Sequence, residues 1–290
     1  MSTSSDIFIS GITIVRNAEI LDYPFRESVL SLLPLCDEVI INCGDSDDNT
    51  RAICEELRKM SDKIRVIESK WEKKAQSGGY QLKAQTDRAM REAKGNWCFY
   101  IQADEVLHED DRTLIRDAIE KAHGMSNVDG VLFDYVHFYG SHHYTIQGRN
   151  WYRKEVRAFK NFRGIEAFRD AQGFRKAGQR IKAISSGAKV YHYGYVRSAN
   201  SIEKKSTEMA KWWGGSRDCD SNLYRHVGLK RFRGSAPAVM HARIQKAGDT
   251  FDPSKLPRKW DKREIKNALT LLWESVVPIR IGEYRNYELV

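Results

Sequence analysis

The chain has 290 residues, of which 41% are hydrophobic and 30% charged, so it can bury a core and is neither disordered nor fibrous. Its 48 basic and 39 acidic residues give a net charge of +9, which suits nucleic acid, anionic lipid headgroups or phosphorylated small molecules. No stretch approaches the ~20 apolar residues of a membrane span, and the first residues lack the pattern of a secretory signal. We therefore expect a cytoplasmic protein whose five cysteines are reduced thiols.

The first third of the chain alternates between apolar runs and helical patterns. Strands are expected at 8–15, 38–42, 64–67 and 97–101, and helices at 27–35, 50–60 and 81–93. This order predicts a mostly parallel sheet with helices on both faces. Ligands bind beyond the carboxyl ends of such strands, so the expected site lies where three polar clusters follow strands: Arg16-Asn17, Asp45 to Asp48, and Gln102 to Glu105.

The remaining residues have a different character. A helix is expected at 114–122, aromatic-rich strands of mixed or antiparallel style at 130–138, 152–159 and 189–195, and a final amphipathic helix at 265–277. From residue 201 onward we expect short helical runs, with no internal repeat.

Two of the polar clusters carry candidate chemistry. In Gln102-Ala103-Asp104-Glu105 a buried strand ends in two carboxylates, which are hard oxygen ligands suited to Mg²⁺ or Mn²⁺ bridging to phosphate. The segment from Cys43 to Thr50 opens a helix, where backbone N–H groups and aspartates can hold a nucleotide. Helix capping explains each cluster equally well when it is taken alone.

Taken together, the order and spacing of these segments resemble the family 2 glycosyltransferases, which have the GT-A fold. Those enzymes show a strand followed by a loop with Asn, then an Asp-rich S-x-D-x-T turn, a Gly-Asp/Asn-Trp turn, and a strand ending in D-x-D. The counterparts here are ITIVRNAE (12–19), EVIINCGDSDDNT (38–50), AMREAKGNW (89–97) and FYIQADEVL (99–107). The resemblance covers the first 110 residues well and extends weakly to about residue 200.

The resemblance implies a GT-A-type α/β fold and transfer of a sugar from a nucleoside diphosphate donor, with a UDP-sugar as first choice. Residues 1–110 would form the nucleotide-sugar-binding half, 111–200 the acceptor half of the same domain, and 201–290 a C-terminal helical extension. It further implies help from Mn²⁺ or Mg²⁺ and inversion at the anomeric carbon. The basic second half suits a glycan, lipid-linked or phosphorylated acceptor and peripheral contact with the inner face of a membrane.

The family pattern also assigns roles to individual residues. Asp104 corresponds to the metal-binding acid, and His192 in KVYHYGYVR (189–197) to a late histidine ligand, although a histidine in an aromatic strand also serves as a packing residue. Asp170 is the expected catalytic base, with Glu166 in reserve. Arg153 and Arg157 are expected on one strand face as a clamp for diphosphate. The full set of expected donor-binding residues is Asn17, Asp45, Asp48, Gln102, Ala103, Asp104, Arg153 and Arg157.

The sequence departs from the family pattern at two places. Gln102 stands where D-x-D has its first Asp, and Cys43-Gly44 stand where the Asp-rich turn usually begins with Asp. An inactive relative of these enzymes therefore remains an alternative, as does a basic nucleic-acid-binding module. Nucleotidyl transfer is disfavoured because VRNAEILDYPFR, after the first strand, lacks the glycines of a phosphate loop.

Overall fold

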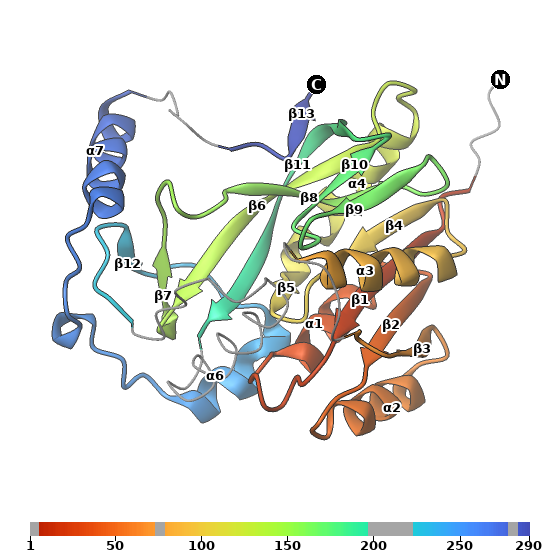
Figure 1. Cartoon of the computed structure of the whole chain (residues 1–290), viewed down its shortest axis with the longest axis horizontal. Coiled ribbons are helices and arrows are strands. Elements are labelled where there is room, and N and C mark those ends of the chain that lie inside the picture. Colours follow the sequence, from red (N-terminus) through yellow and green to blue (C-terminus); the bar gives the residue numbers. More distant parts are fainter. Residues whose placement is uncertain (1–5, 73–78, 197–222, 278–283) are drawn as a thin grey trace.

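The computed structural model describes residues 6–72, 79–196, 223–277 and 284–290. A mixed sheet runs through these ranges, and helices lie on both of its faces (Figure 1). The strands are β1 (Ile9–Val15), β2 (Glu38–Gly44), β3 (Ile64–Ser69), β4 (Trp97–Tyr100), β5 (Glu105–Leu107), β6 (Gly130–Tyr139), β7 (Ser141–Ile146), β8 (Lys154–Lys160), β9 (Ile165–Phe168), β10 (Gly173–Lys176), β11 (Gln179–Tyr195), β12 (Leu229–Arg231) and β13 (Tyr287–Leu289). The α-helices are α1 (Phe25–Leu32), α2 (Thr50–Met60), α3 (Tyr80–Glu92), α4 (Arg112–His123), α6 (His241–Ala247) and α7 (Lys262–Val276).

The first four strands form the parallel part of the sheet, in the spatial order β3-β2-β1-β4. Every residue of β1, β2 and β4 is buried, which is why these strands are near-continuous apolar runs in the sequence. The predicted βαβ order is confirmed. The ends differ slightly from the prediction, since α1 starts at Phe25 and β2 continues to Gly44.

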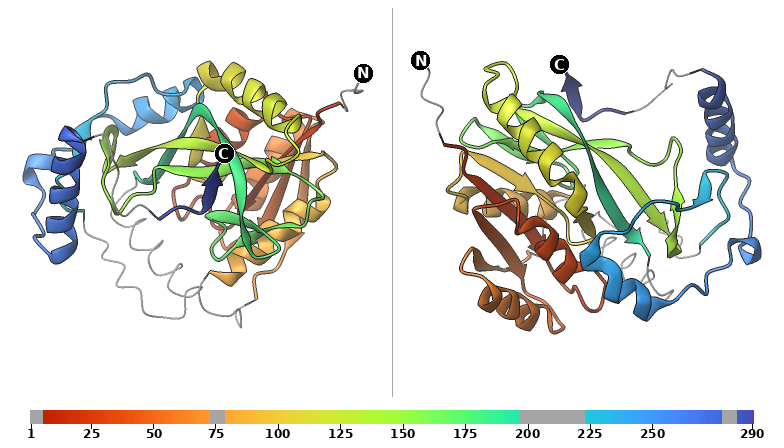
Figure 2. Two further views of the ribbon diagram at one scale, coloured as in Figure 1. Left: turned by 90° about the horizontal axis from the view of Figure 1, so that it is seen from above. Right: turned by 180° about the vertical axis from the view of Figure 1, so that it is seen from behind.

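Two hydrophobic clusters cover the two faces of this sheet. Side chains of α1, α2 and α4 pack on one face, where Phe25, Leu57 and Ile119 are among the buried residues. On the other face α3 and the β9–β10 hairpin pack through Met90 and Phe174. The view from behind in Figure 2 shows α1 and α4 together on the first of these faces.

The second half of the sheet is more mixed than the first. Strand β8 is antiparallel to both β4 and β6, whereas β6 and β11 are parallel. Strand β11 begins at Gln179, ten residues before the expected strand at 189, and the short β5 pairs with it in antiparallel register. This register places Glu105 of β5 opposite His192 of β11, and His192 opposite His137 of β6.

The C-terminal part contains strands as well as helices. Strand β12 pairs with β7, and β13 pairs with the start of β11 and so joins the central sheet. The short helical runs expected from residue 201 fall partly on 197–222, outside the described residues. Cys36, Cys43, Cys54 and Cys98 are buried free thiols, while Cys219 lies outside the described residues. None of the helices in the described ranges is long and apolar enough to cross a membrane.

Candidate active site

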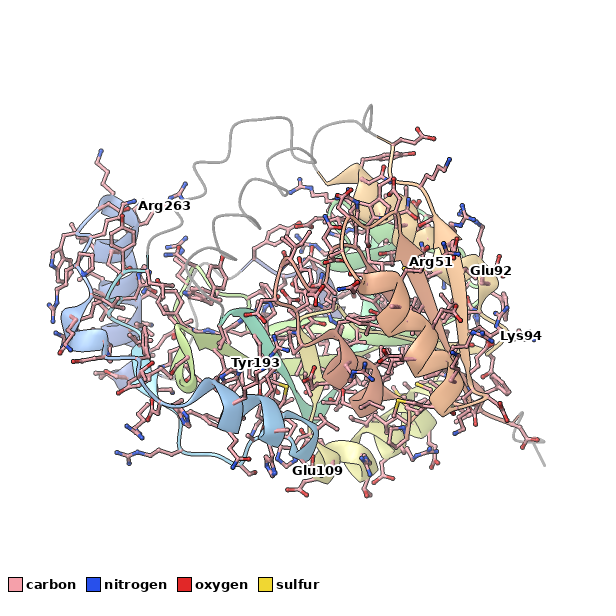
Figure 3. All side chains as sticks on the ribbon, turned by 90° about the horizontal axis from the view of Figure 1, so that it is seen from below. Arg51, Glu92, Lys94, Glu109, Tyr193 and Arg263 are labelled. Atoms are coloured by element: carbon pink, nitrogen blue, oxygen red, sulfur yellow. The ribbon has the colours of Figure 1, made fainter. Side chains whose placement is uncertain are left out.

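Asp104 and His192 lie side by side at the carboxyl edge of the parallel strands. Asp104 directly precedes β5, and its carbonyl accepts a hydrogen bond of 2.8 Å from the Tyr193 N–H of β11. Tyr193 is labelled near the middle of the molecule in Figure 3. The Asp104 Oδ2 and His192 Nε2 atoms are 3.9 Å apart, and both side chains are more than nine-tenths buried. The pairing of β5 with β11 thus joins two residues that are far apart in the sequence.

Gly194 lies directly against these two atoms. A Cβ at this position would lie 2.5 Å from His192 Nε2 and 3.2 Å from Asp104 Oδ2. The first distance is shorter than real Cβ contacts, so an alanine here would push the imidazole away. The absence of a side chain at Gly194 therefore lets the His192 imidazole pack directly over the Gly194 backbone, next to the Asp104 carboxylate.

A chain of hydrogen bonds fixes the orientation of His192. His137 Nε2 is 2.6 Å from the Tyr152 carbonyl oxygen, and His137 Nδ1 is 2.9 Å from His192 Nδ1. Because a carbonyl only accepts, His137 donates from Nε2, and burial lowers its pKa to about 4, which keeps the ring neutral. His137 Nδ1 then accepts from His192 Nδ1–H. This tautomer leaves the lone pair of His192 on Nε2, the atom that faces Asp104.

The Asp104–His192 pair fits a divalent cation. Two ligands that bind one ion at about 2.0–2.1 Å lie at most about 4.2 Å apart, so a separation of 3.9 Å is compatible with a shared ion. In the described ranges no group of three or more His, Cys, Asp or Glu residues forms a metal cluster. Two protein ligands suit Mg²⁺ or Mn²⁺, since such ions usually keep water and substrate phosphate in their remaining positions.

The carboxylate next to Asp104 has a different role. Glu105 is fully buried and forms a two-point ion pair with Arg157, with distances of 2.9 Å from Nε to Oε2 and 2.8 Å from Nη2 to Oε1. The Tyr135 hydroxyl also donates to Glu105, at 2.7 Å. Removing one partner of such a buried pair typically costs about 3–5 kcal/mol, because the other charge is left uncompensated. The Glu105–Arg157 pair therefore holds β5 against β8.

The structure corrects the expected arginine clamp. The Arg157 side chain has no exposed surface and is used by Glu105, so it does not face a solvent-filled donor site. Arg153 lies just before β8 and forms an ion pair with Glu274 of α7, with 2.6 Å between Nη2 and Oε2. Arg153 and Arg157 do not lie together on one strand face as expected, because the strand begins at Lys154 and the two arginines pair with different partners.

The loops after β1 and β2 are tied together by their polar side chains. Asn17, which has a positive φ of 54°, accepts from the Asp47 N–H and donates its own N–H to the Ser46 hydroxyl. Asp48 accepts from the N–H groups of Glu19, Ile20 and Thr50, which leaves it a structural role at the start of α2. Asp45 is half-exposed and accepts from the Trp71 N–H at 3.0 Å.

Gln102 and Ala103 form the turn between β4 and the Asp104–Glu105 pair. The Gln102 N–H donates to Glu105 Oε2 at 3.1 Å, and its carbonyl accepts from the Ser28 hydroxyl and from the Glu105 N–H. Ala103 is buried in the cluster on the α1 face. The backbone at Gln102 is thus fixed by α1 and Glu105, and this determines the position from which Asp104 points.

Asp170 and Glu166, the two expected bases, lie in different surroundings. Asp170 is in the turn between β9 and β10, against Gly79 at the start of α3, where an added Cβ would be 2.7 Å from Asp170 Cβ. Two residues later the Gln172 carbonyl accepts from Arg157 Nη1 at 2.9 Å, which anchors this turn beside the buried Glu105–Arg157 pair. Glu166 lies on β9 and pairs with Lys83 of α3 at 2.7 Å.

A family comparison decides what kind of protein carries this site. The model of the family described as glycosyl transferase family 2 matches residues 23–177, just over half of the chain. The chain belongs to glycosyl transferase family 2. The match spans α1 to β10 and includes Asp104, Glu105, Arg157 and Asp170. The expected family and the GT-A-type α/β fold are confirmed.

Solved structures similar to this family 2 chain cover part of it. The structure of Staphylococcus aureus TarS has 15% identity and a TM-score of 0.42, covering 70% of this chain and 40% of that chain. The TarS 1–349 complex with UDP has 20% identity and a TM-score of 0.34, covering 46% of this chain and 36% of that chain. Glucosyl-3-phosphoglycerate synthase from Mycobacterium tuberculosis with Mn²⁺, UDP and phosphoglyceric acid has 18% identity and a TM-score of 0.32, covering 44% and 43%. This chain thus spans less than half of each protein's structure, and no curated protein sequence matches it significantly.

Three features of this family 2 site were not found from the sequence. The role of His137 depends on the pairing of β6 with β11, which no local pattern shows. The Glu105–Arg157 pair joins residues of β5 and β8, although a Glu directly after the expected metal acid was a visible signal. Gly194 lies two residues after His192, so its spacing was visible, but its close contact with the imidazole beside Asp104 becomes apparent only in the structure.

Proposed function

We propose that this family 2 chain transfers a glycosyl group from a nucleoside diphosphate sugar to an acceptor hydroxyl, with metal assistance and inversion. One observation carries the proposal: Asp104 Oδ2 and His192 Nε2 lie 3.9 Å apart at the sheet edge where such folds bind ligands. Family membership supports the reaction class.

Asp104 and His192 are the residues that would hold Mn²⁺ or Mg²⁺. The ion, when bound, would neutralise the negative charge that develops on the leaving diphosphate. His137 and the Tyr152 carbonyl keep the proton of His192 on Nδ1, so that Nε2 offers its lone pair without rearrangement. The carboxylate and the imidazole are thus oriented before any ligand arrives.

The donor nucleotide would lie along the loops that follow β1, β2 and β4. Asp45 is a half-exposed acidic side chain of the β2 loop, and Asn17 and Asp48 hold the shape of the surrounding loops. Gln102 and Ala103 would contribute the turn beside the diphosphate. Arg153 is the remaining cation of the expected clamp, and its approach to a phosphate would require exchange of its Glu274 partner.

Asp170 is the proposed catalytic base. The acceptor oxygen would form a bond to the anomeric carbon while the bond from that carbon to the diphosphate oxygen breaks, and the acceptor proton would pass to the Asp170 carboxylate. The turn that holds Asp170 is anchored through Gln172 to Arg157, which pairs with Glu105, the residue that follows the proposed metal ligand Asp104. Glu166 is a weaker candidate because its carboxylate already pairs with Lys83.

The acceptor is proposed only by chemical class, as a glycan, a lipid-linked molecule or a phosphorylated molecule. A thermal-shift panel of UDP, GDP, CMP and dTDP compounds, each with Mn²⁺ and with EDTA, tests the donor proposal. A ligand at ~100 times its dissociation constant adds about 2.7 kcal/mol of stability, which gives a shift of several degrees. We expect one nucleotide class, with UDP tested first, to stabilise the protein in Mn²⁺. If none of the four raises the melting temperature under either condition, the chain is an inactive relative of the family.

A further inference from the structure

Helix α7 is amphipathic, but its apolar face points to solvent and its polar face points into the protein. Its apolar side chains point outward, with exposed fractions of 48% for Ile265, 62% for Leu269, 65% for Leu272, 45% for Trp273 and 78% for Val276. The spacing of 265, 269, 272 and 276 places four of them on one helix face, and Trp273 borders it. We call these five residues the α7 apolar stripe. Exposed contiguous apolar surface of this kind usually marks a contact with another apolar phase or surface.

The inward face of α7 is polar and is held by specific hydrogen bonds. Glu264 accepts from the Val227 N–H at 2.7 Å, and Asn267 accepts from the Arg149 N–H at 2.8 Å. The ion pair between Glu274 and Arg153 fixes the C-terminal half of the helix. The helix start is capped by Asp261, whose side chain accepts from two backbone N–H groups. These contacts dock the helix through its polar face, and the four aliphatic side chains of the stripe, Ile265, Leu269, Leu272 and Val276, remain exposed.

The charges around the stripe are mostly positive. Helical spacing places Lys262 and Lys266 on the helix surface next to the α7 apolar stripe, in line with Trp273. All of the basic side chains from 258 to 266 are exposed. These basic residues are Arg258, Lys259, Lys262, Arg263 and Lys266. The same stretch has one exposed carboxylate, that of Asp261, which caps the helix. Arg263 is labelled on α7 in Figure 3, on the opposite side of the molecule from Arg51 of α2. Trp260, next to this cluster, is also 57% exposed.

We infer that α7 is a membrane-surface helix that binds the headgroup region of a bilayer containing anionic lipid. An interfacial helix has an apolar face of Leu, Ile and Trp, a polar face rich in Lys and Arg, and a length that need not span the bilayer. The stripe would lie among the upper acyl chains, and the lysines would reach the headgroups. A second copy of the chain fits the stripe less well, because its own basic row would be brought against the first.

Membrane binding by α7 does not depend on sugar transfer. One consequence does rest on the proposed function. Glu274 of α7 pairs with Arg153, which follows Tyr152 in the chain. The Tyr152 carbonyl orients His137, and His137 in turn orients His192. A bilayer-bound α7 would thus be linked through these contacts to the proposed metal ligand His192.

Vesicle co-sedimentation of the full chain, without nucleotide or metal, tests the inference. Vesicles of phosphatidylcholine alone are compared with vesicles containing 30% phosphatidylglycerol, at low and high salt. We expect at least ten-fold tighter binding to the anionic vesicles and weaker binding at high salt, since each basic residue near an anionic surface is worth about five-fold. The double variant L269Q/L272Q should lose at least ten-fold in affinity. The matched control M60Q/L114Q, which removes two exposed apolar residues from α2 and α4, should bind as wild type.

Each other result would overturn the inference. Equal binding to both vesicle types, no binding to anionic vesicles, or wild-type binding by L269Q/L272Q would each exclude α7 as the membrane contact. Sedimentation velocity would show whether the wild type is a dimer that L269Q/L272Q converts to monomer, in which case a second copy covers the stripe instead. All of these variants lie at exposed positions, and a melting curve identifies any that does not fold. Because donor binding is measured separately, a failure here leaves the proposed transferase function unaffected.

Discussion

Replacing Gly194 by alanine perturbs the proposed metal site without removing any of its ligands. The added Cβ would be 2.5 Å from His192 Nε2 and 2.6 Å from its Cε1, whereas ordinary contacts of a Cβ begin at 3.4 Å. The imidazole must therefore move by about 0.9 Å, and metal–ligand distances tolerate only about ±0.2 Å. Gly194 has no positive φ, so alanine can adopt its backbone conformation and the effect comes from the lost space.

We expect G194A to weaken Mn²⁺ binding about 10- to 100-fold, the range found when residues supporting metal ligands are changed. Titration of the free Mn²⁺ signal by electron paramagnetic resonance, with and without UDP, measures this affinity directly. The matched control is G124A at the end of α4, where an added Cβ would be 3.7 Å from its nearest neighbour. It should bind Mn²⁺ as wild type. A folded G194A protein with wild-type Mn²⁺ affinity would refute the placement of the ion between Asp104 and His192.

Three further predictions follow from the contacts around the site. The variant H137F should lower Mn²⁺ affinity. The variant H137N should keep part of that affinity, because its amide oxygen can still accept from His192 Nδ1–H. Equal affinities in the two variants would show that His137 does not position His192. The variant D170N should lower turnover ~10²–10⁴-fold while donor affinity stays near wild type, as steady-state kinetics and calorimetry would show; turnover within a few-fold of wild type would clear this residue. Burial raises the pKa of Glu155 to about 7, so the folded chain holds a proton that the unfolded chain releases, and the contribution of Glu155 to stability should fall by about 3 kcal/mol as pH rises from 4.5 to 7. Denaturant unfolding of E155Q should show a smaller decrease over that range, and an identical pH profile would contradict the assignment.

The parallel half of the fold was predictable because its strands are buried on both faces. Runs such as 9–15 and 38–44 are buried throughout and mostly apolar, and the helix 50–60 that follows them has one apolar face, so element type and order follow from local periodicity. The strands in the second half of the fold are harder to predict from local sequence pattern. Strand β11 alternates exposed and buried residues, and Gly187, at a φ of 74°, lies inside a register shift against β6, so only the apolar end of β11 is recognisable as a strand from the sequence. The β9–β10 hairpin is short and rich in charge.

The site was predictable as a set of residue types, and much less so as a set of contacts. Asp104 and His192 were expected from the family pattern, and the structure brings them together through the β5–β11 register. Arg157 was misplaced because its partner Glu105 is distant in sequence, and burial of an arginine cannot be inferred without knowing which carboxylate meets it. The roles of Asp48 and Asn17 in holding loops are likewise set by backbone groups of a neighbouring loop.

Coupling between nucleotide and metal binding tests the central claim, that Asp104 and His192 hold a cation which assists departure of the donor diphosphate. Isothermal titration calorimetry would measure the affinity of the nucleoside diphosphate selected by the thermal-shift panel, in Mn²⁺ and in EDTA, for wild type and D104N. We predict at least ten-fold weaker binding by wild type in EDTA, equivalent to about 1.4 kcal/mol, and equally weak binding by D104N under both conditions. Wild-type affinity that is unchanged in EDTA, or a D104N protein that keeps the full Mn²⁺ dependence, would contradict the claim.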